Sequence, residues 1–176
     1  MKIIAIGAVT AGGKTTIVNA VKDKLPKTAA LYFDDYTFEG EVEDFGKWLS
    51  EGADCEVWDL SPLKADTEKL ISSGKYEYLL LDYPFAYLHK MMRDYLDTCI
   101  FIDTPLDIAL ARRVLRDMKD ASADDIRTEM DSYLKFARPA YIHMLETVLP
   151  SSDHVIDGTK DIGEIVDEVV KIISNC

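Results

Sequence analysis

The sequence predicts an α/β fold in which helices cover both faces of a parallel β-sheet. Stretches with the apolar spacing of helices alternate with strand-like stretches along the whole chain, which is the pattern that builds such sheets. The strand-like stretches are short continuous apolar runs, as expected for strands that are buried on both faces. The chain has 176 residues and shows no internal repeat or linker, so residues 1–176 are expected to form a single domain.

The N-terminal stretch, residues 2–16, reads KIIAIGAVTAGGKTT. Its apolar start predicts a strand, a turn of small residues follows, and residues 16–25 have helical spacing. Small residues let successive backbone N–H groups turn inward toward an anion. In such a loop Lys14 is expected to reach the β- and γ-phosphates of ATP, and the Thr15 hydroxyl to hold Mg²⁺. The loop departs from the full pattern at Ala8, which stands where the first glycine is usual.

The phosphate-binding assignment covers six consecutive residues: Ala11, Gly12, Gly13, Lys14, Thr15 and Thr16. The alternative is a glycine-rich turn with a stray lysine. The strand before the turn and the helix after it favour the phosphate loop, because that context is what the motif requires. The expected fold is therefore the three-layer α/β fold of P-loop NTPases.

Four further strands are expected after the first one. Each is a short apolar run bounded by polar or turn-forming residues. Their expected ranges are residues 29–33, 78–81, 98–102 and 154–156.

Helices are expected between these strands. Ser61 and Pro62 form a cap followed by proline at the first helical position, and Gly74 ends that helix. Ser122 caps a longer helix, which Pro139 is expected to disturb just before its own position. The last helix is amphipathic. The expected ranges are residues 16–25, 41–50, 61–72, 85–95, 105–118, 122–149 and 161–173.

Composition and charge limit the partners of the chain. The formal net charge of −12 makes non-specific binding of nucleic acid or of an anionic membrane unfavourable. No stretch reaches the length of a transmembrane helix, and the N-terminal apolar run is too short for a signal peptide. The three cysteines are scattered, which fits a reducing cytoplasm. We therefore expect a cytoplasmic protein that acts on a small molecule.

Acidic residues follow two of the expected strands, where ligands bind in parallel sheets. Asp82 is expected to bind Mg²⁺ directly or through water; a turn aspartate before Pro84 is the alternative. Asp34 and Asp35 are adjacent, so one of them is expected to face the γ-phosphate and accept the proton of an acceptor hydroxyl. A turn-forming aspartate pair is the alternative there.

Three arginines gather on the expected helix 105–118. Arg112 and Arg116 share a face, and Arg113 lies close to it. Guanidinium groups suit phosphate oxygens, so closing them over the γ-phosphate would stabilise the charge of the transition state. The alternative is a solvated surface patch paired with Asp117 and Asp120.

Trp58 and Asp59 suit a nucleoside, because an aromatic platform lies beside an acceptor for hydroxyl groups. A core tryptophan is an equal alternative. Further aromatic candidates for the acceptor pocket are Tyr36, Phe38, Tyr83, Phe85 and Tyr87. The three histidines have no metal or triad spacing and receive no role.

Taken in order, these features resemble the uridine kinase and nicotinamide riboside kinase group of P-loop nucleoside kinases. The similarity lies in the phosphate loop, in FDDY at residues 33–36, in LARRVLRD at residues 110–117 and in VIDGTK at residues 155–160. It covers essentially the whole chain, although only the phosphate loop is highly specific alone. The resemblance implies a five-stranded parallel sheet with flanking helices and a small arginine-bearing lid, around residues 112–125.

The resemblance also implies roles for individual residues. Asp34 would be the catalytic base, beside Asp35, and Asp82 would replace the glutamate that is common in those families. The residues implied to contact ATP are Lys14, Arg112, Arg113, Arg116, Gly158 and Thr159, with Lys14, Arg112 and Arg116 acting in catalysis. The residues implied to hold the nucleoside are Asp34, Asp35, Tyr36, Trp58 and Asp59.

The expected function is ATP- and Mg²⁺-dependent transfer of the γ-phosphoryl group to a hydroxyl of a small molecule, a uridine, cytidine or nicotinamide riboside type of nucleoside above all. Residues 71–82 are shorter than in typical uridine kinases, so another small alcohol stays open as the acceptor. A kinase of another metabolite and a non-catalytic ATP-binding protein are the alternatives. A GTPase is disfavoured, because residues 159–162 lack the acid of the guanine motif.

Overall fold

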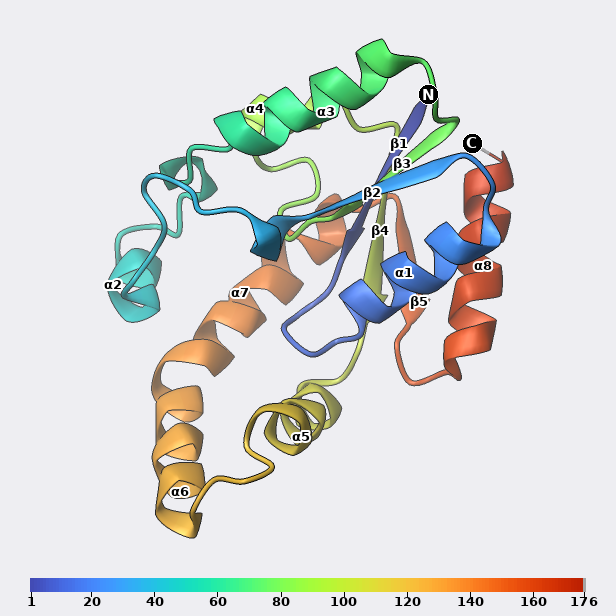
Figure 1. The fold of residues 1–176 in the computed structure, drawn as a ribbon. Helices are drawn as coiled ribbons and strands as arrows, with labels where there is room; N and C mark the ends of the chain where they lie inside the picture. Colours follow the sequence, from blue (N-terminus) through green and yellow to red (C-terminus); the bar gives the residue numbers. More distant parts are fainter. Residues whose placement is uncertain (176) are drawn as a thin grey trace.

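The structure is a computed structural model that describes residues 1–175; Cys176 lies outside the described residues. Figure 1 shows strands and helices alternating along the chain. The strands are β1 (Lys2–Gly7), β2 (Thr28–Tyr32), β3 (Tyr78–Asp82), β4 (Thr98–Asp103) and β5 (His154–Asp157). The helices are α1 (Lys14–Lys24), α2 (Phe45–Ser50), α3 (Ser61–Ser73), α4 (Lys90–Arg93), α5 (Leu106–Asp117), α6 (Ala123–Ser132), α7 (Arg138–Thr147) and α8 (Ile162–Asn175). Shorter turns are η1 (Phe33–Asp35), η2 (Cys55–Val57), η3 (Tyr133–Ala137) and η4 (Leu149–Ser151).

One parallel sheet forms the centre of the described chain. Its five strands within residues 1–175 are ordered β2-β3-β1-β4-β5, so the first strand lies in the middle. In the register, Ile6 pairs with Asp82 of β3, and Ile4 pairs with Thr98 of β4. Because all pairings are parallel, the carboxyl ends of the strands lie along one edge, which gathers the phosphate loop, η1 and Asp82.

Helices cover both faces of this sheet, which confirms the predicted three-layer architecture (Figure 1). Successive residues of β1 point to opposite faces, and each face has its own core. Ile4 and Ile6 pack against α1 and α8. Ile3 and Ala5 pack in the other core, with residues of α3, α4 and α7. Full burial of such side chains contributes about 1.5–3 kcal/mol each, so both faces stabilise the sheet.

Two expected helices differ from the structure. The helix expected over residues 41–50 begins only at α2, because Asp44 caps it by accepting a 2.9 Å hydrogen bond from the Lys47 N–H. The expectation of a helix over residues 85–95 is wrong except for the short α4. Ala86 has a positive φ of 46°, and His89 caps α4 through a hydrogen bond from the Met91 N–H. These local conformations interrupt helical geometry, and the buried residues before α4 run through the core as irregular chain.

The segment from α6 to α7 behaves as its sequence predicts. Ser122 forms a capping box with Asp125 at the start of α6. The disturbance expected before Pro139 is confirmed as the π-helical turn η3, which joins α6 to α7. In Figure 1, α5 and α6 extend away from the sheet, beyond the carboxyl ends of its strands. That residues 112–125 act as a lid stays a prediction.

The short second strand ends earlier than expected. β2 stops at Tyr32, and the next residues form the 3-10 turn η1, which carries Asp34 and Asp35 past the end of the sheet. None of the helices formed by residues 1–175 combines the length and apolarity needed to cross a membrane.

Candidate active site

The phosphate loop joins β1 to α1 with a backbone that requires small residues. Ala11 and Gly13 have positive φ angles of 59° and 100°, and the Gly12 N–H donates a 2.8 Å hydrogen bond to the Val9 carbonyl. A Cβ added at Gly12 would lie 2.8 Å from that carbonyl oxygen, so a larger residue would open the turn. Gly13 is the N-cap of α1 and offers no side-chain acceptor to the N–H groups of the first turn. These N–H groups are therefore available to an anion.

Lys14, Thr15 and Asp82 meet at the base of this loop. The Lys14 ammonium forms an ion pair with Asp82, and the Thr15 hydroxyl donates a 2.6 Å hydrogen bond to the other oxygen of the same carboxylate. Asp82 is only 2% exposed. Burial lowers the pKa of Lys14, and the negative charge of Asp34 partly opposes that shift. The structure thus brings together the two residues that the sequence analysis assigned to Mg²⁺.

The oxygen atoms at this position fit Mg²⁺ bound together with a nucleotide. Carboxylate and hydroxyl oxygens are hard ligands, which Mg²⁺ prefers. No cluster of three or more His, Cys, Asp or Glu side chains suited to a metal occurs in the described part of the chain. Mg²⁺ does not need one, because it usually keeps several waters and binds one or two protein groups plus substrate phosphates. Binding of Mg²⁺ by Thr15 and Asp82 stays a prediction.

A cavity of about 800 Å³ opens from the phosphate loop. Asp34 lies on its wall, whereas Asp35 is not among its lining residues. The negative charge of Asp34 acts to raise the pKa values of Lys14 and Arg116, which favours their charged forms. This placement favours Asp34 over Asp35 as the carboxylate near the transferred phosphoryl group, and its role as base stays a prediction.

The three arginines of α5 all line the cavity, with different partners. Arg112 donates a 3.5 Å hydrogen bond to the Gly158 carbonyl, and among described residues it has no carboxylate partner within salt-bridge distance. Arg113 pairs with Glu129 of α6 at 2.7 Å. Arg116 pairs with its neighbour Asp117 at 2.6 Å, and this hydrogen bond raises the pKa of Arg116. Arg112 is therefore the arginine most available to a phosphate, while Arg113 connects α5 to α6.

Thr104, directly after β4, links the phosphate loop to the loop after β5. The buried Thr104 hydroxyl lies 2.8 Å from the Gly12 carbonyl, to which it donates, and 3.5 Å from the Gly158 carbonyl. Gly158 lines the cavity, whereas Thr159 is exposed and bonds Asp157 through its own hydroxyl and N–H. The structure therefore brings Gly158 to the cavity and leaves Thr159 beside it, in a turn.

Part of the cavity wall is aromatic. Trp58 is 6% exposed and packs against Phe85 at a centroid distance of 5.1 Å and against Trp48 at 5.5 Å. All three line the cavity, so Trp58 belongs to the core and to the cavity wall at once. Two further lining residues, Phe45 and His143, extend this wall from α2 and α7.

The structure does not bring Tyr36 and Asp59 to the cavity. The Tyr36 hydroxyl donates a 3.1 Å hydrogen bond to Asp66 of α3. Burial is the main cause that raises the pKa of Tyr36 to about 12, and this hydrogen bond is the second. Asp59 is exposed and accepts hydrogen bonds from the N–H and the hydroxyl of Ser61, at 3.0 and 2.5 Å. Asp59 therefore bonds the first residue of α3, whose N-cap is Leu60 and not the expected Ser61. The acid beside the tryptophan has a local structural partner two residues along the chain, an Asx-type bond that favours a structural role for Asp59.

Sequence reasoning missed Trp48, Lys160 and His143 as cavity residues. Trp48 lies within the helix expected over residues 41–50 without a motif of its own, and His143 has no metal or triad spacing. Their proximity arises between α2 and α7, which are far apart in sequence, so no local pattern could have found it. Lys160 follows the VIDGT stretch, and its position after the last strand was the signal that could have been used.

Comparisons with known proteins agree with this geometry. Residues 71–162, just over half of the chain, match the sequence profile of the Phosphoribulokinase / Uridine kinase family. A uridine kinase from Borrelia hermsii is 25% identical to this chain over an alignment of 178 positions. The alignment covers 89% of this chain and 86% of that protein.

Solved structures show the same fold at lower sequence identity. A sugar kinase from Janibacter sp. has a TM-score of 0.62 at 15% identity, covering 99% of this chain and 95% of that one. The deoxyadenosine kinase from M. mycoides has a TM-score of 0.55 at 13% identity, covering 99% of this chain and all (100%) of that one. These likenesses concern the fold alone.

Proposed function

The chain belongs to the phosphoribulokinase / uridine kinase family, and on that premise we propose that it transfers the γ-phosphoryl group of ATP to a hydroxyl of a nucleoside. Membership makes it an ATP-dependent kinase whose acceptor is a hydroxyl group of a small molecule. What we propose beyond this is that the acceptor is a nucleoside, that the reaction uses Mg²⁺ and that the residues named below bind the substrates and assist the transfer.

One observation carries the proposal. The same cavity is lined by the phosphate loop, by Asp34 and by an aromatic wall, so groups that suit phosphate and groups that suit a ring share one space. Aromatic rings such as Trp58 and Phe85 offer flat faces on which a base can stack, and stacking of this kind contributes about 1–3 kcal/mol per base. A nucleoside would therefore place its base on this wall and a sugar hydroxyl near Asp34.

The placement of the basic residues of the cavity supports an acceptor that carries no phosphate group. Those among the lining residues are Lys14, Arg112, Arg113, Arg116 and Lys160. They come from the start of α1, from α5 and from the loop after β5, next to the phosphate loop. The aromatic wall contributes no lysine or arginine among the described lining residues, so an acceptor that carries its own phosphate would lack a cation there.

In the proposed reaction the chain mainly positions its substrates and balances charge, which is what phosphoryl transfer requires. The phosphate loop and Lys14 bind the β- and γ-phosphates, and Arg112 faces the phosphoryl group as it moves. Asp34 orients the acceptor hydroxyl and accepts its proton. Mg²⁺, held by Thr15 and Asp82, would neutralise charge on the phosphate oxygens.

The test is ADP release from ATP and Mg²⁺ with one acceptor at a time. The acceptors are uridine, cytidine, nicotinamide riboside, pantothenate and ribulose 5-phosphate. Release that depends on one of the three nucleosides supports the proposal. Release only with pantothenate or ribulose 5-phosphate would show that the protein is a kinase but would contradict a nucleoside as its acceptor.

A further inference from the structure

His143 has a position that the proposed chemistry does not yet use. It lies on α7, lines the cavity and is half-buried. Its ring faces Trp48 of α2 edge-on, with a centroid distance of 5.8 Å and an interplanar angle of 85°. His143 therefore belongs to the aromatic wall that we assign to the acceptor.

The imidazole of His143 is free to bond a ligand. No hydrogen bond joins either of its ring nitrogens to another residue within 1–175, the part of the chain that the structure describes. His89 shows the contrast: it is buried, its Nε2 lies 3.0 Å from the Trp58 carbonyl, and its Nδ1 accepts from the Met91 N–H. The ring nitrogens of His89 are thus used by the fold, and those of His143 are not.

Two residues near His143 have polar groups that are already bonded within the protein, whereas the ring nitrogens of His143 are not bonded to any described residue. The Trp48 indole N–H donates a 2.9 Å hydrogen bond to the Asp54 carbonyl, so Trp48 offers the cavity only its ring. The Thr147 hydroxyl, also at the cavity, donates at 2.7 Å to the backbone carbonyl of His143 itself. His143 is therefore one of the polar groups that this wall offers to the edge of a bound ring.

Packing fixes the wall that carries this group. A Cβ added to Gly46 of α2 would lie 3.2 Å from a ring atom of Phe136, so α2 is in close contact with η3, directly before α7. The bond from Trp48 to Asp54 fixes the orientation of the indole. Trp48 and His143 thus hold a defined relative position although they come from distant parts of the sequence.

We propose that His143 determines acceptor specificity by hydrogen bonding to the polar edge of the acceptor's ring, while Trp48 packs against that ring. This inference rests on the proposed function and deepens it. A neutral imidazole offers one N–H donor and one acceptor nitrogen, so it recognises a carbonyl or N–H group on a planar ring. The ligand class is a ring-bearing alcohol with an amide-like ring edge, bound with its hydroxyl toward Asp34.

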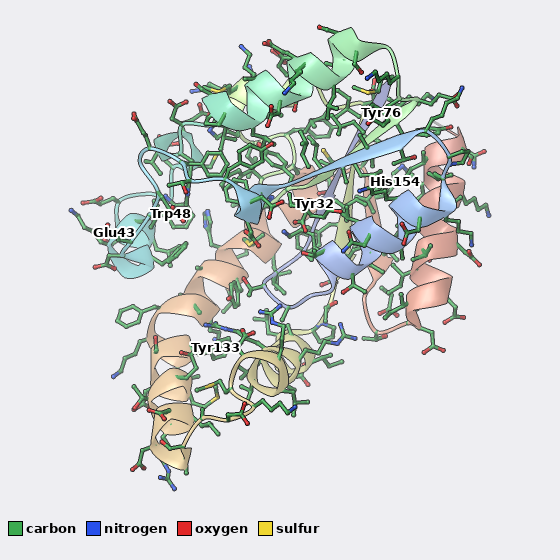
Figure 2. The ribbon with its side chains drawn as sticks, in the orientation of Figure 1. Tyr32, Glu43, Trp48, Tyr76, Tyr133 and His154 are labelled. Atoms are coloured by element: carbon green, nitrogen blue, oxygen red, sulfur yellow. The ribbon has the colours of Figure 1, made fainter. Side chains whose placement is uncertain are left out.

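The test compares two variants at His143 with a matched control. His143→Phe keeps a ring against Trp48 and removes the hydrogen bond, and His143→Gln keeps hydrogen-bonding capacity. His154→Phe is the control, because His154 is exposed at the start of β5 and does not line the cavity. Figure 2 shows Trp48 and His154 at opposite sides of the molecule.

The readout is the KM for the accepted nucleoside, the KM for ATP and kcat. For His143→Phe we expect the nucleoside KM to rise on the order of 10-fold, because the variant loses one hydrogen bond to a neutral group. The KM for ATP and kcat should change little, and His143→Gln should recover part of the loss. An unchanged nucleoside KM in His143→Phe, or an equal rise for ATP, would overturn the inference.

A binding measurement separates this inference from the proposed function. Both tryptophans of the chain, Trp48 and Trp58, line the cavity, so quenching of intrinsic fluorescence reports what binds there. Uridine and nicotinamide riboside are the probes. If the wild-type protein shows no turnover but binds a probe more tightly than His143→Phe does, the proposed function fails and the role of His143 stands. Equal binding by both proteins, or binding by neither, overturns the role of His143.

Discussion

The Thr15 hydroxyl donates a 2.6 Å hydrogen bond to Asp82, which joins the start of α1 to the end of β3. The same carboxylate is paired with Lys14. Three residues that contribute to ATP and Mg²⁺ binding in the proposed reaction therefore meet at one buried point. Their proximity follows from the register, in which Asp82 pairs with Ile6 of β1, directly before the loop.

Asp82→Asn should weaken the use of Mg²⁺ more than the binding of ATP. The amide keeps the size of the side chain and removes its charge, so we expect the Mg²⁺ concentration for half-maximal activity to rise about 10–100-fold. Titration of activity with Mg²⁺ measures it. Asp103→Asn, at the end of β4 on the other side of β1, is the control. An equal effect of both changes would show that Asp82 has no specific role.

Asp34→Asn should lower kcat on the order of 10²–10⁴-fold if Asp34 is the base, and should leave ATP binding intact. Asp35→Asn is the matched control, because Asp35 is adjacent but does not line the cavity. Steady-state kinetics and ATP binding by calorimetry provide the readouts. A larger loss in Asp35→Asn would assign the base to the other carboxylate.

Thr104→Val should destabilise the fold and disturb the phosphate loop. The Thr104 hydroxyl is buried and bonds the Gly12 carbonyl, so removing it leaves that carbonyl unsatisfied, at a cost of about 1–3 kcal/mol in the free energy of unfolding. Urea denaturation measures the change. Thr98→Val serves as control, because the buried Thr98 hydroxyl makes only a 3.4 Å contact with Asp153. Equal stability losses would contradict the specific role of Thr104.

Two glycines should respond in opposite directions to alanine. A Cβ at Gly158 would lie 2.0 Å from the Thr104 hydroxyl, so Gly158→Ala should lower the free energy of unfolding by about 1–3 kcal/mol. Gly163 lies in α8 with no atom within 4 Å of an added Cβ, so Gly163→Ala should raise it by roughly 0.5–1 kcal/mol. Thermal unfolding of both variants gives the signs. A stabilised Gly158→Ala would mean that the contact with Thr104 is wrong.

Asp153 should make stability depend on acidic pH. Burial opposes its ionisation, but hydrogen bonds from the Tyr87 hydroxyl and the Cys99 N–H outweigh that effect, so the pKa of Asp153 lies below its ordinary value. Its contribution is therefore present above the unfolded-state pKa of about 3.9 and is lost as the pH falls through the folded-state pKa.

The corresponding variant is Asp153→Asn. At pH 7 it should be less stable than the wild type by only about 1 kcal/mol, since Asp153 is exposed and solvent screens its charge. The difference should shrink between pH 5 and about pH 2. Urea denaturation across this range measures it. A difference that stays constant with pH would contradict a role for the ionised carboxylate.

Features that depend on local chemistry could be predicted from the sequence. The phosphate loop follows from the small residues before Lys14 and from the strand and helix around them, and the capping box at Ser122 is equally local. The five strands and the disturbance before Pro139 also follow from neighbouring residues. The helix expected over residues 85–95 is wrong except for α4, because Ala86 has a positive φ and the buried His89 ring contacts the carbonyl of Trp58, a residue from a distant segment.

The acceptor end of the site depends on contacts between distant segments. Trp48 faces His143 and Trp58 packs against Phe85, and neither pairing has a signal at one place in the sequence. The phosphate end is carried by a continuous motif, and the acceptor end is assembled by the fold. For that reason the class of reaction could be predicted from the sequence, whereas the acceptor's contacts could not.

The most direct test of the account is the transfer of label from γ-³²P-ATP to a nucleoside by the purified protein. Uridine, cytidine and nicotinamide riboside are supplied singly, with Lys14→Ala as the inactive control. The account predicts label on one nucleoside with the wild-type protein and none with Lys14→Ala, because the phosphates lose their lysine. Label found only in inorganic phosphate, or on none of the three nucleosides, would contradict the conclusion that the protein is a nucleoside kinase.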